Sequence, residues 1–246
     1  MSRSRPSLLV SVRNLAEARA AIDGGCDRLD VKEPSRGPLG KADADVMAEI
    51  AAFARKGIDR HNDISCSVAL GEIDETQDAT GPFLLPRGVS DIKLGPARLG
   101  SRESWAKGWR RATERIHGED PRSVRRVAVA YADWQAAGAA APEEILDAAI
   151  AARADAFLVD TYSKDSGNLL EALTVEELKR LAATTREAGM LLALAGSLRM
   201  EHLPALFDVL PDVIAVRGAA CEAGHRSAHV SSACVARLKA AIDELF

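Results

Sequence analysis

The sequence lacks a long hydrophobic run, an excess of positive charge and a flexible linker. No stretch of its 246 residues approaches the length of a membrane span, although 47% of them are hydrophobic. The N-terminal apolar run ends after Val10 and reaches Arg13 too soon for a secretory signal. A formal net charge of −4 argues against a nucleic-acid surface, which requires clustered positive charge. We therefore expect a cytoplasmic protein that binds neither membranes nor nucleic acids.

Metal-binding motifs are also absent. The four cysteines form no CxxC pair, and the five histidines form neither an HxH nor an HExxH motif. We therefore expect no metal site. In a cytoplasmic chain the cysteines are expected to be reduced and buried; they are Cys26, Cys66, Cys221 and Cys234.

What the sequence does contain is an alternation of short β-branched runs with longer amphipathic segments. This rhythm predicts a parallel sheet covered by helices, in one domain spanning residues 1–246. The runs cover residues 8–12, 28–32, 64–70, 91–95, 126–132, 156–161, 191–197 and 213–219. Helices are expected at residues 14–23, 43–56, 142–153, 174–188 and 231–245.

Several helix ends carry local signals. Asn14 with Glu17, and Thr174 with Glu177, have the spacing of N-terminal caps, whereas Gly24 and Gly189 stand where a helix must stop. Residues 72–90 are rich in proline and glycine, which predicts a short or irregular crossover.

Eight strands with intervening helices in a chain of 246 residues predict an α/β fold, a single-domain (β/α)8 TIM barrel. A doubly wound open sheet is the competing architecture, but no G-x-G-x-x-G follows the first run. A barrel of this size with apolar helices also favours a homo-oligomer.

Polar residues recur at the C-terminal ends of the predicted strands. In a TIM barrel these ends converge on one mouth, where active sites lie. We therefore take them together as candidate site residues: Asp30, Lys32, Lys93, Tyr131, Asp133, Asp160, Lys164, Gly196, Ser197, Arg217 and Gly218.

The lysines are the most informative of these residues, because lysine is rarely buried unless it is paired. Asp30 and Lys32 are two apart and share one face of a strand, which allows an ion pair or a proton relay. Crowded ammonium groups lower one another's pKa, and a neutral amine can form a Schiff base. Each lysine taken alone could be an exposed residue paired with a carboxylate. Because three of them, Lys32, Lys93 and Lys164, lie around one rim, we favour a role in Schiff-base chemistry. The residues alone leave Lys32 and Lys93 equal as nucleophiles.

Glycine-containing turns follow the last two predicted strands. Gly196 and Ser197 end one strand, and Arg217 and Gly218 end the next. TIM barrels commonly bind phosphate through backbone N–H groups at this place, and an arginine can add a bidentate contact. The two turns together predict a phosphate site.

These motifs resemble those of the (5-formylfuran-3-yl)methyl phosphate synthase family of methanofuran biosynthesis. The most specific are DVKEP-x-x-GPLG (residues 30–40), LAGS (194–197) and VRGAAC (216–221). DIKLG, YAD and VDTYSKD also belong to the resemblance. The resemblance implies condensation of two glyceraldehyde 3-phosphate molecules to 4-(hydroxymethyl)-2-furancarboxaldehyde phosphate, with release of phosphate and water. The implied lyase acts through a lysine Schiff base and without a cofactor.

The resemblance also implies roles for individual residues. Lys32 matches the Schiff-base lysine, Lys93 the proton acceptor and Asp30 the carboxylate beside the Schiff-base lysine. Asp160 and Lys164 match acid/base or substrate-orienting groups. The chain departs from the family pattern at residues 72–90 and at EAGHRS (222–227), which leaves the phosphate contacts beyond Arg217 undefined.

Two other functions remain open. A class I aldolase acting on triose phosphates would use the same lysine and the same phosphate turns but give a different product. A non-catalytic barrel that binds a phosphorylated ligand, or a metal for homeostasis, would form no covalent adduct at Lys32.

Overall fold

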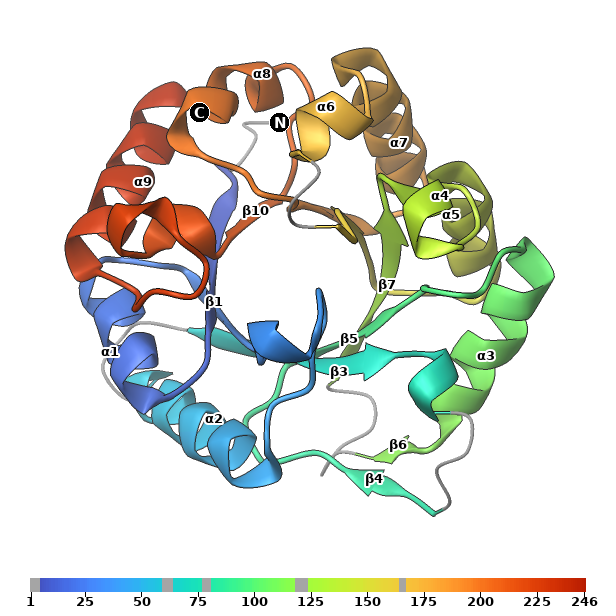
Figure 1. Cartoon of the computed structure of the whole chain (residues 1–246), viewed down its shortest axis with the longest axis horizontal. Coiled ribbons are helices and arrows are strands. Elements are labelled where there is room, and N and C mark those ends of the chain that lie inside the picture. The colour runs from blue at the N-terminus through green and yellow to red at the C-terminus, as the bar shows by residue number, and fades with distance from the viewer. Residues whose placement is uncertain (1–4, 59–63, 77–80, 118–123, 164–166) are drawn as a thin grey trace.

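The computed structural model describes residues 5–58, 64–76, 81–117, 124–163 and 167–246. Parallel strands close into a barrel in the order β1-β10-β9-β8-β7-β5-β3-β2, and helices surround it as an outer ring (Figure 1). The predicted (β/α)8 barrel is therefore confirmed. The barrel strands are β1 Ser7–Val12, β2 Arg28–Val31, β3 Ser65–Glu72, β5 Asp91–Gly95, β7 Arg125–Tyr131, β8 Ala156–Asp160, β9 Leu191–Leu194 and β10 Val213–Val216.

The helices of the outer ring follow the strands in chain order. They are α1 Leu15–Asp23, α2 Ala44–Ile58, α3 Arg102–Glu114, α4 Trp134–Ala137, α5 Pro142–Ala151, α6 Leu169–Ala172, α7 Val175–Glu187, α8 Leu203–Phe207 and α9 Ser232–Leu245. Short 3₁₀ turns lie in the loops: η1 Pro34–Arg36, η2 Asp74–Thr76, η3 Met200–His202, η4 Gly218–Ala220 and η5 Glu222–Gly224. No helix in the described ranges has the length and apolar character that a bilayer crossing requires.

The core has two layers because successive side chains of a strand point to opposite faces. Leu29 and Val31 of β2 pack outward against the helices, in one large apolar cluster. The alternate positions of the same strand, Arg28 and Asp30, face the barrel interior. Apolar residues such as Leu9 and Leu158 fill much of that interior. Alternation along each strand therefore determines which residues can reach the mouth.

The predicted caps form. The Asn14 side chain accepts the N–H of Glu17 at 2.9 Å, and Thr174 and Glu177 bond reciprocally at the start of α7. Gly24 ends α1, and Gly189 follows α7 with a φ of 72°. All four cysteines are free thiols; Cys26, Cys66 and Cys221 are buried and Cys234 is half-buried.

The structure changes the predicted ends of two strands and shows the form of one crossover. β9 and β10 end at Leu194 and Val216, three residues earlier than the apolar runs, because the chain turns away from the sheet there. Between β3 and β5 the described residues form η2 and the short β4 (Phe83–Leu84), which pairs outside the barrel with β6 (Ile116–His117). This is the irregular crossover that the prolines and glycines predicted.

Candidate active site

A cavity of about 260 Å³ opens at the C-terminal ends of the strands. Most of the sequence-predicted site residues meet there. Lys164 alone lies outside the described residues. The cavity is lined by Ser11, Asp30, Lys32, Leu39, Lys93, Leu158, Asp160, Ala195, Gly196, Ser197, Leu198, Arg199, Ala215, Val216, Arg217, Gly218, Ala219, Gly224, His225 and Arg226.

A buried ion pair lies at the floor of this cavity. The Nζ atom of Lys93 on β5 lies 2.6 Å from Oδ1 of Asp30 on β2. Ser67 on β3, between the two strands, donates to Oδ1 at 2.8 Å, and Ser11 on β1 donates to Oδ2 at 3.0 Å. The sequence spacing allowed an ion pair or a proton relay between Asp30 and Lys32. The close ion pair that the structure shows is with Lys93, because the inward positions of β2, β3 and β5 form one layer inside the barrel.

This environment keeps Asp30 ionised although it is only 1% exposed. Burial opposes the charge, but Lys93, then Lys32 and the hydrogen bond from Ser67, hold the pKa of Asp30 below its ordinary value. A carboxylate held in this way can keep an ammonium group oriented or accept a proton late in a reaction.

Lys32 follows β2 and is also buried, at 8% exposure. Its Nζ donates to the Pro38 carbonyl at 3.3 Å. The chain from Glu33 to Gly40 doubles back over the mouth, and a side chain at Gly40 would meet the Glu33 carbonyl at 2.1 Å. The glycines of the GPLG motif therefore allow the loop to bring Leu39 down as a wall of the cavity.

Asp160 ends β8 and lines the same cavity with 3% exposure. Its Oδ1 accepts the N–H of Thr161 at 2.8 Å, which orients the carboxylate. Asp133 does not reach the cavity lining; its carboxylate accepts the N–H groups of Tyr162 and Ser163 and so holds the loop after β8.

The two predicted phosphate turns lie side by side on the β9 and β10 side of the cavity. Gly196 and Ser197 have φ values of 101° and 52°, and Gly196 packs so closely on Thr161 that a Cβ would lie 2.9 Å from its methyl group. Among the described residues, the backbone N–H groups of Ser197, Gly218 and Ala219 donate no hydrogen bond. These donors suit an anion.

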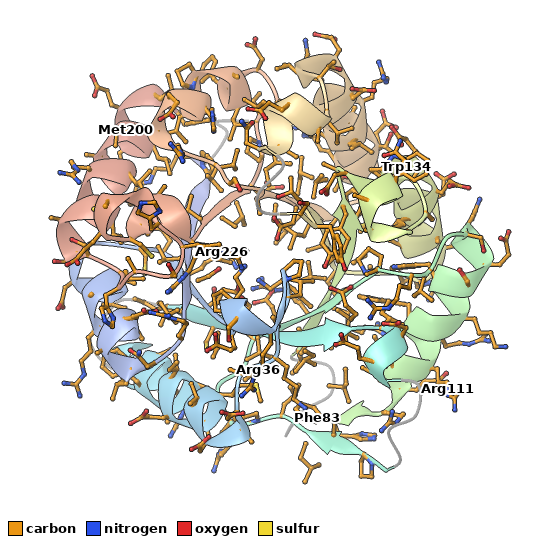
Figure 2. All side chains as sticks on the ribbon, viewed as in Figure 1. Arg36, Phe83, Arg111, Trp134, Met200 and Arg226 are labelled. Carbon is orange, nitrogen blue, oxygen red and sulfur yellow. The ribbon has the colours of Figure 1, made fainter. Side chains whose placement is uncertain are left out.

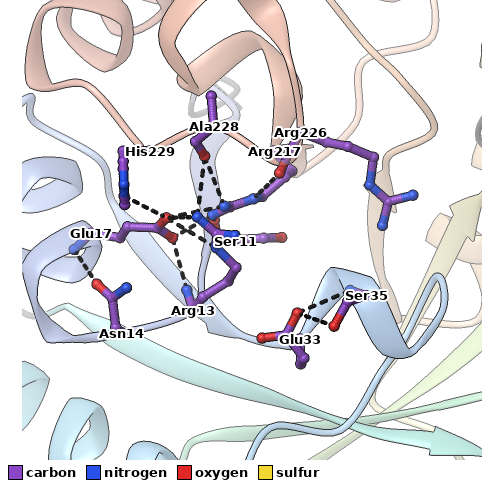
Figure 3. A network of polar contacts seen from close by, with 10 residues as sticks. All are labelled: Ser11, Arg13, Asn14, Glu17, Glu33, Ser35, Arg217, Arg226, Ala228 and His229. Carbon is purple, nitrogen blue, oxygen red and sulfur yellow. Dashed lines mark hydrogen bonds and ion pairs between the residues drawn. The ribbon is translucent and has the colours of Figure 1, made fainter.

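Arg217 departs from the expected role. We expected it to contact phosphate, but its five N–H donors are all engaged in the network of Figure 3. Two bonds go to Glu17, at 2.5 and 3.1 Å, and the other three go to the carbonyls of Ser11, Arg226 and Ala228. A bidentate phosphate contact is not available to a guanidinium in this arrangement.

Glu17 is the second half of that network. Burial disfavours its charge, but Arg217 and Arg13 lower its pKa below the ordinary value. The sequence indicated Glu17 only as a capping residue, because nothing in its local pattern shows which arginines surround it after the barrel has closed.

Tyr131, one of the predicted strand-end residues, does not line the cavity but forms a buried pair with Glu72, which the sequence did not indicate. The hydroxyl of Tyr131 donates to Glu72 at 2.6 Å, and the N–H of Ala97 donates to the same carboxyl group at 2.9 Å. Burial raises the pKa of Glu72, and burial with the nearby Glu72 raises that of Tyr131 well above its usual range. Gly95 makes room for the pair, since a Cβ there would lie 2.1 Å from the Glu72 carboxylate.

Fold and site together define a class. A closed (β/α)8 barrel with buried lysines and an anion-suited turn at one mouth is the architecture of TIM-barrel enzymes. Within the described residues, no group of three or more His, Cys, Asp or Glu side chains is arranged to hold a metal ion.

Within that class, the chain belongs to the 4-HFC-P synthase family, whose profile matches residues 8–239. It is 34% identical over 227 residues to a (5-formylfuran-3-yl)methyl phosphate synthase of Methanopyrus kandleri, covering 91% of this chain and 92% of the relative. A protein of the same name from Archaeoglobus fulgidus is 29% identical over 238 residues, covering 96% and 98%. The family resemblance of the sequence motifs is therefore confirmed.

Solved structures agree on the fold. A thiamine phosphate pyrophosphorylase from Pyrococcus furiosus superposes with a TM-score of 0.57 at 15% identity, covering 98% of this chain and 96% of that one. A phosphoribosyl anthranilate isomerase from Thermococcus kodakaraensis gives 0.56 at 14% identity, covering 96% and 98%. At this sequence identity the two structures support the barrel fold and nothing about function.

Proposed function

We propose that this protein condenses two molecules of glyceraldehyde 3-phosphate to 4-(hydroxymethyl)-2-furancarboxaldehyde phosphate, releasing phosphate and water, in biosynthesis of methanofuran or a related C1 carrier. The observation that carries the proposal is the presence of Lys32 and Lys93, both buried, in one cavity with Asp30, in a chain of the 4-HFC-P synthase family.

In the proposed reaction Lys32 attacks the aldehyde of one triose phosphate and forms an iminium ion with loss of water. The iminium ion acidifies the adjacent carbon, and removal of a proton there gives an enamine. The enamine attacks the aldehyde of the second triose. Elimination of phosphate, ring closure and loss of water then give the furan, and hydrolysis frees Lys32.

Lys93 and Asp30 suit the proton transfers of this scheme. Their 2.6 Å contact lets a proton move between amine and carboxylate while both stay fixed, and Ser11 and Ser67 hold the carboxylate in place. Asp160 faces the same cavity as a further acid/base or orienting group. The turns at Gly196–Ser197 and Gly218 supply N–H donors for a substrate phosphate.

Incubation with glyceraldehyde 3-phosphate alone tests the proposal. We expect inorganic phosphate and a furan chromophore to appear together, with the mass of the product matching the furancarboxaldehyde phosphate. A reversible aldol product without phosphate release would assign the protein to the aldolases instead. Ligand binding with no turnover would favour the non-catalytic alternative.

A further inference from the structure

We propose that Arg226 is the side chain that binds the phosphate group of a phosphate monoester at this mouth, and that Arg217 is the positioning residue that fixes it there. The inference concerns phosphate recognition by the cavity and does not depend on which carbon bonds the protein makes or breaks.

Arg226 lies on the loop between η5 and α9, at the inner edge of the ring of helices (Figure 2). It is half-buried and lines the cavity together with Gly218 and Ala219. Figure 3 shows its guanidinium directed away from the Arg217–Glu17 network, on the side of the η1 turn. One of its nitrogens, Nη2, donates to the Pro34 carbonyl of that turn at 3.3 Å. A carbonyl oxygen at this distance occupies a position that a phosphate oxygen could take.

The backbone that carries Arg226 is held by hydrogen bonds from Arg217. Arg217 donates from Nε to the Arg226 carbonyl at 3.0 Å and from Nη2 to the Ala228 carbonyl at 3.2 Å. The same guanidinium is fixed by Glu17, whose side chain is only 1% exposed. A buried ion pair between Glu17 on α1 and Arg217, the residue after β10, therefore fixes two carbonyls of the loop, and the position of the Arg226 backbone is defined.

Backbone donors and Arg226 lie on the same side of the cavity. A Cβ added at Gly218 would lie 3.7 Å from the backbone nitrogen of Arg226, so the two backbones approach closely, and both residues line the cavity. The N–H groups of Gly218 and Ala219 take part in no hydrogen bond within the described residues. A planar guanidinium in the same cavity lining as such donors can bind two oxygens of a phosphate at once.

The charge of the lining agrees with a dianionic ligand. Its carboxylates are Asp30, which is paired with Lys93, and Asp160. Its cations include Lys32, Arg199 and Arg226. The lining of this cavity therefore carries more cationic than anionic side chains, although the protein as a whole is acidic.

Titration with inorganic phosphate, followed calorimetrically, tests the proposal on the full chain. We expect Arg226→Met to raise the dissociation constant for phosphate at least about tenfold, since hydrogen bonds to charged groups are lost. The dissociation constant of Arg226→Lys should lie between those of the unsubstituted protein and Arg226→Met, because lysine keeps the charge but not the bidentate donor geometry. The matched control is Arg36→Met, on the loop over the same mouth, whose guanidinium is bound by Asp43 and does not line the cavity.

Unchanged phosphate binding in both Arg226 variants would overturn the proposal. Equal weakening of phosphate binding by Arg36→Met would also overturn it, because the effect would then follow from the loss of any positive charge near the mouth. Failure of the unsubstituted protein to bind phosphate would overturn it as well. Circular dichroism of each variant verifies folding, and Arg226→Lys serves if Arg226→Met is not folded. Because no turnover is measured, these results stand whether or not a furan is formed.

Discussion

At the scale of single residues, the Asp30 carboxylate has three close partners from three other strands. It accepts hydrogen bonds from Ser11 and Ser67 and pairs with Lys93. Burial opposes the charge, but Lys93, Lys32 and the hydrogen bond from Ser67 together outweigh it and lower the pKa of Asp30. Ser11 and Ser67 are therefore positioning residues for the lysine that we propose as proton acceptor.

Ser67→Ala tests this role. Loss of the hydrogen bond removes stabilisation of the carboxylate, so the pKa of Asp30 should rise toward its ordinary value. We expect kcat to fall by about one order of magnitude, as for the loss of one buried charge-assisted hydrogen bond, with little change in KM. The acid limb of the kcat–pH profile should move to higher pH.

Ser65→Ala is the matched control for this substitution. Ser65 lies on the same strand and faces the interior two residues earlier, where it contacts Arg28 at the other end of the barrel. If Ser67→Ala and Ser65→Ala gave the same pH profile, Asp30 would not depend on Ser67.

At the scale of secondary-structure elements, Glu72 and Tyr131 join β3 to β7 across β5. Their 2.6 Å hydrogen bond and the Ala97 N–H satisfy a carboxyl group that is only 6% exposed. We expect Tyr131→Phe to lower the free energy of unfolding by about 1–3 kcal/mol, because one buried partner is removed. Urea denaturation measures this. Tyr162→Phe, at the neighbouring half-buried ring, is the control, and equal stability of the two variants would contradict the account.

The pH dependence of stability tests the same pair. The pKa of Glu72 is raised in the folded protein, so the folded state retains this proton to higher pH than the unfolded state. The stability contributed by the protonated form is complete below the unfolded pKa and is lost as pH rises through the folded pKa. Glutamine stays neutral at every pH, so we expect the free energy of unfolding of Glu72→Gln to change less than that of the unsubstituted protein as pH rises through the folded pKa of Glu72. Identical pH dependence in the two proteins would contradict this.

The elements also show why the strand boundaries were predictable only in part. The eight apolar runs correspond to the eight barrel strands because a parallel strand covered on both sides must be apolar nearly throughout. The predicted strands continued past Leu194 and Val216 through residues 195–197 and 217–219, where the chain has already left the sheet. Composition does not reveal the positive φ at Gly196 and Ser197 that turns the chain there.

At the scale of the whole molecule, position at a strand end was sufficient to predict that four residues share one cavity; they are Asp30, Lys32, Lys93 and Asp160. The sequence does not show which of these residues form pairs. The pairs depend on how the inward residues of different strands stack after the barrel closes, and those residues are far apart in the chain. Arg217 illustrates the limit: its strand-end position was foreseen, but its partner Glu17 is 200 residues away. Ser11 and Ser67 had a weak signal, as polar residues inside apolar runs.

The homo-oligomer expected from the sequence remains a prediction. Light scattering coupled to size-exclusion chromatography measures the molar mass directly. We expect a whole multiple of the 26.2 kDa chain greater than one. A mass of one chain at all concentrations would contradict it.

Reductive trapping most directly tests the central claim that Lys32 forms an imine with triose phosphate. The full chain is treated with glyceraldehyde 3-phosphate and borohydride, digested, and mapped by mass spectrometry, with Lys32→Ala and Lys93→Ala in parallel. We predict a borohydride-stable adduct at Lys32 in the unsubstituted protein and none at this position in Lys32→Ala. An adduct confined to Lys93 or Lys164, or no substrate-dependent adduct, would contradict the account.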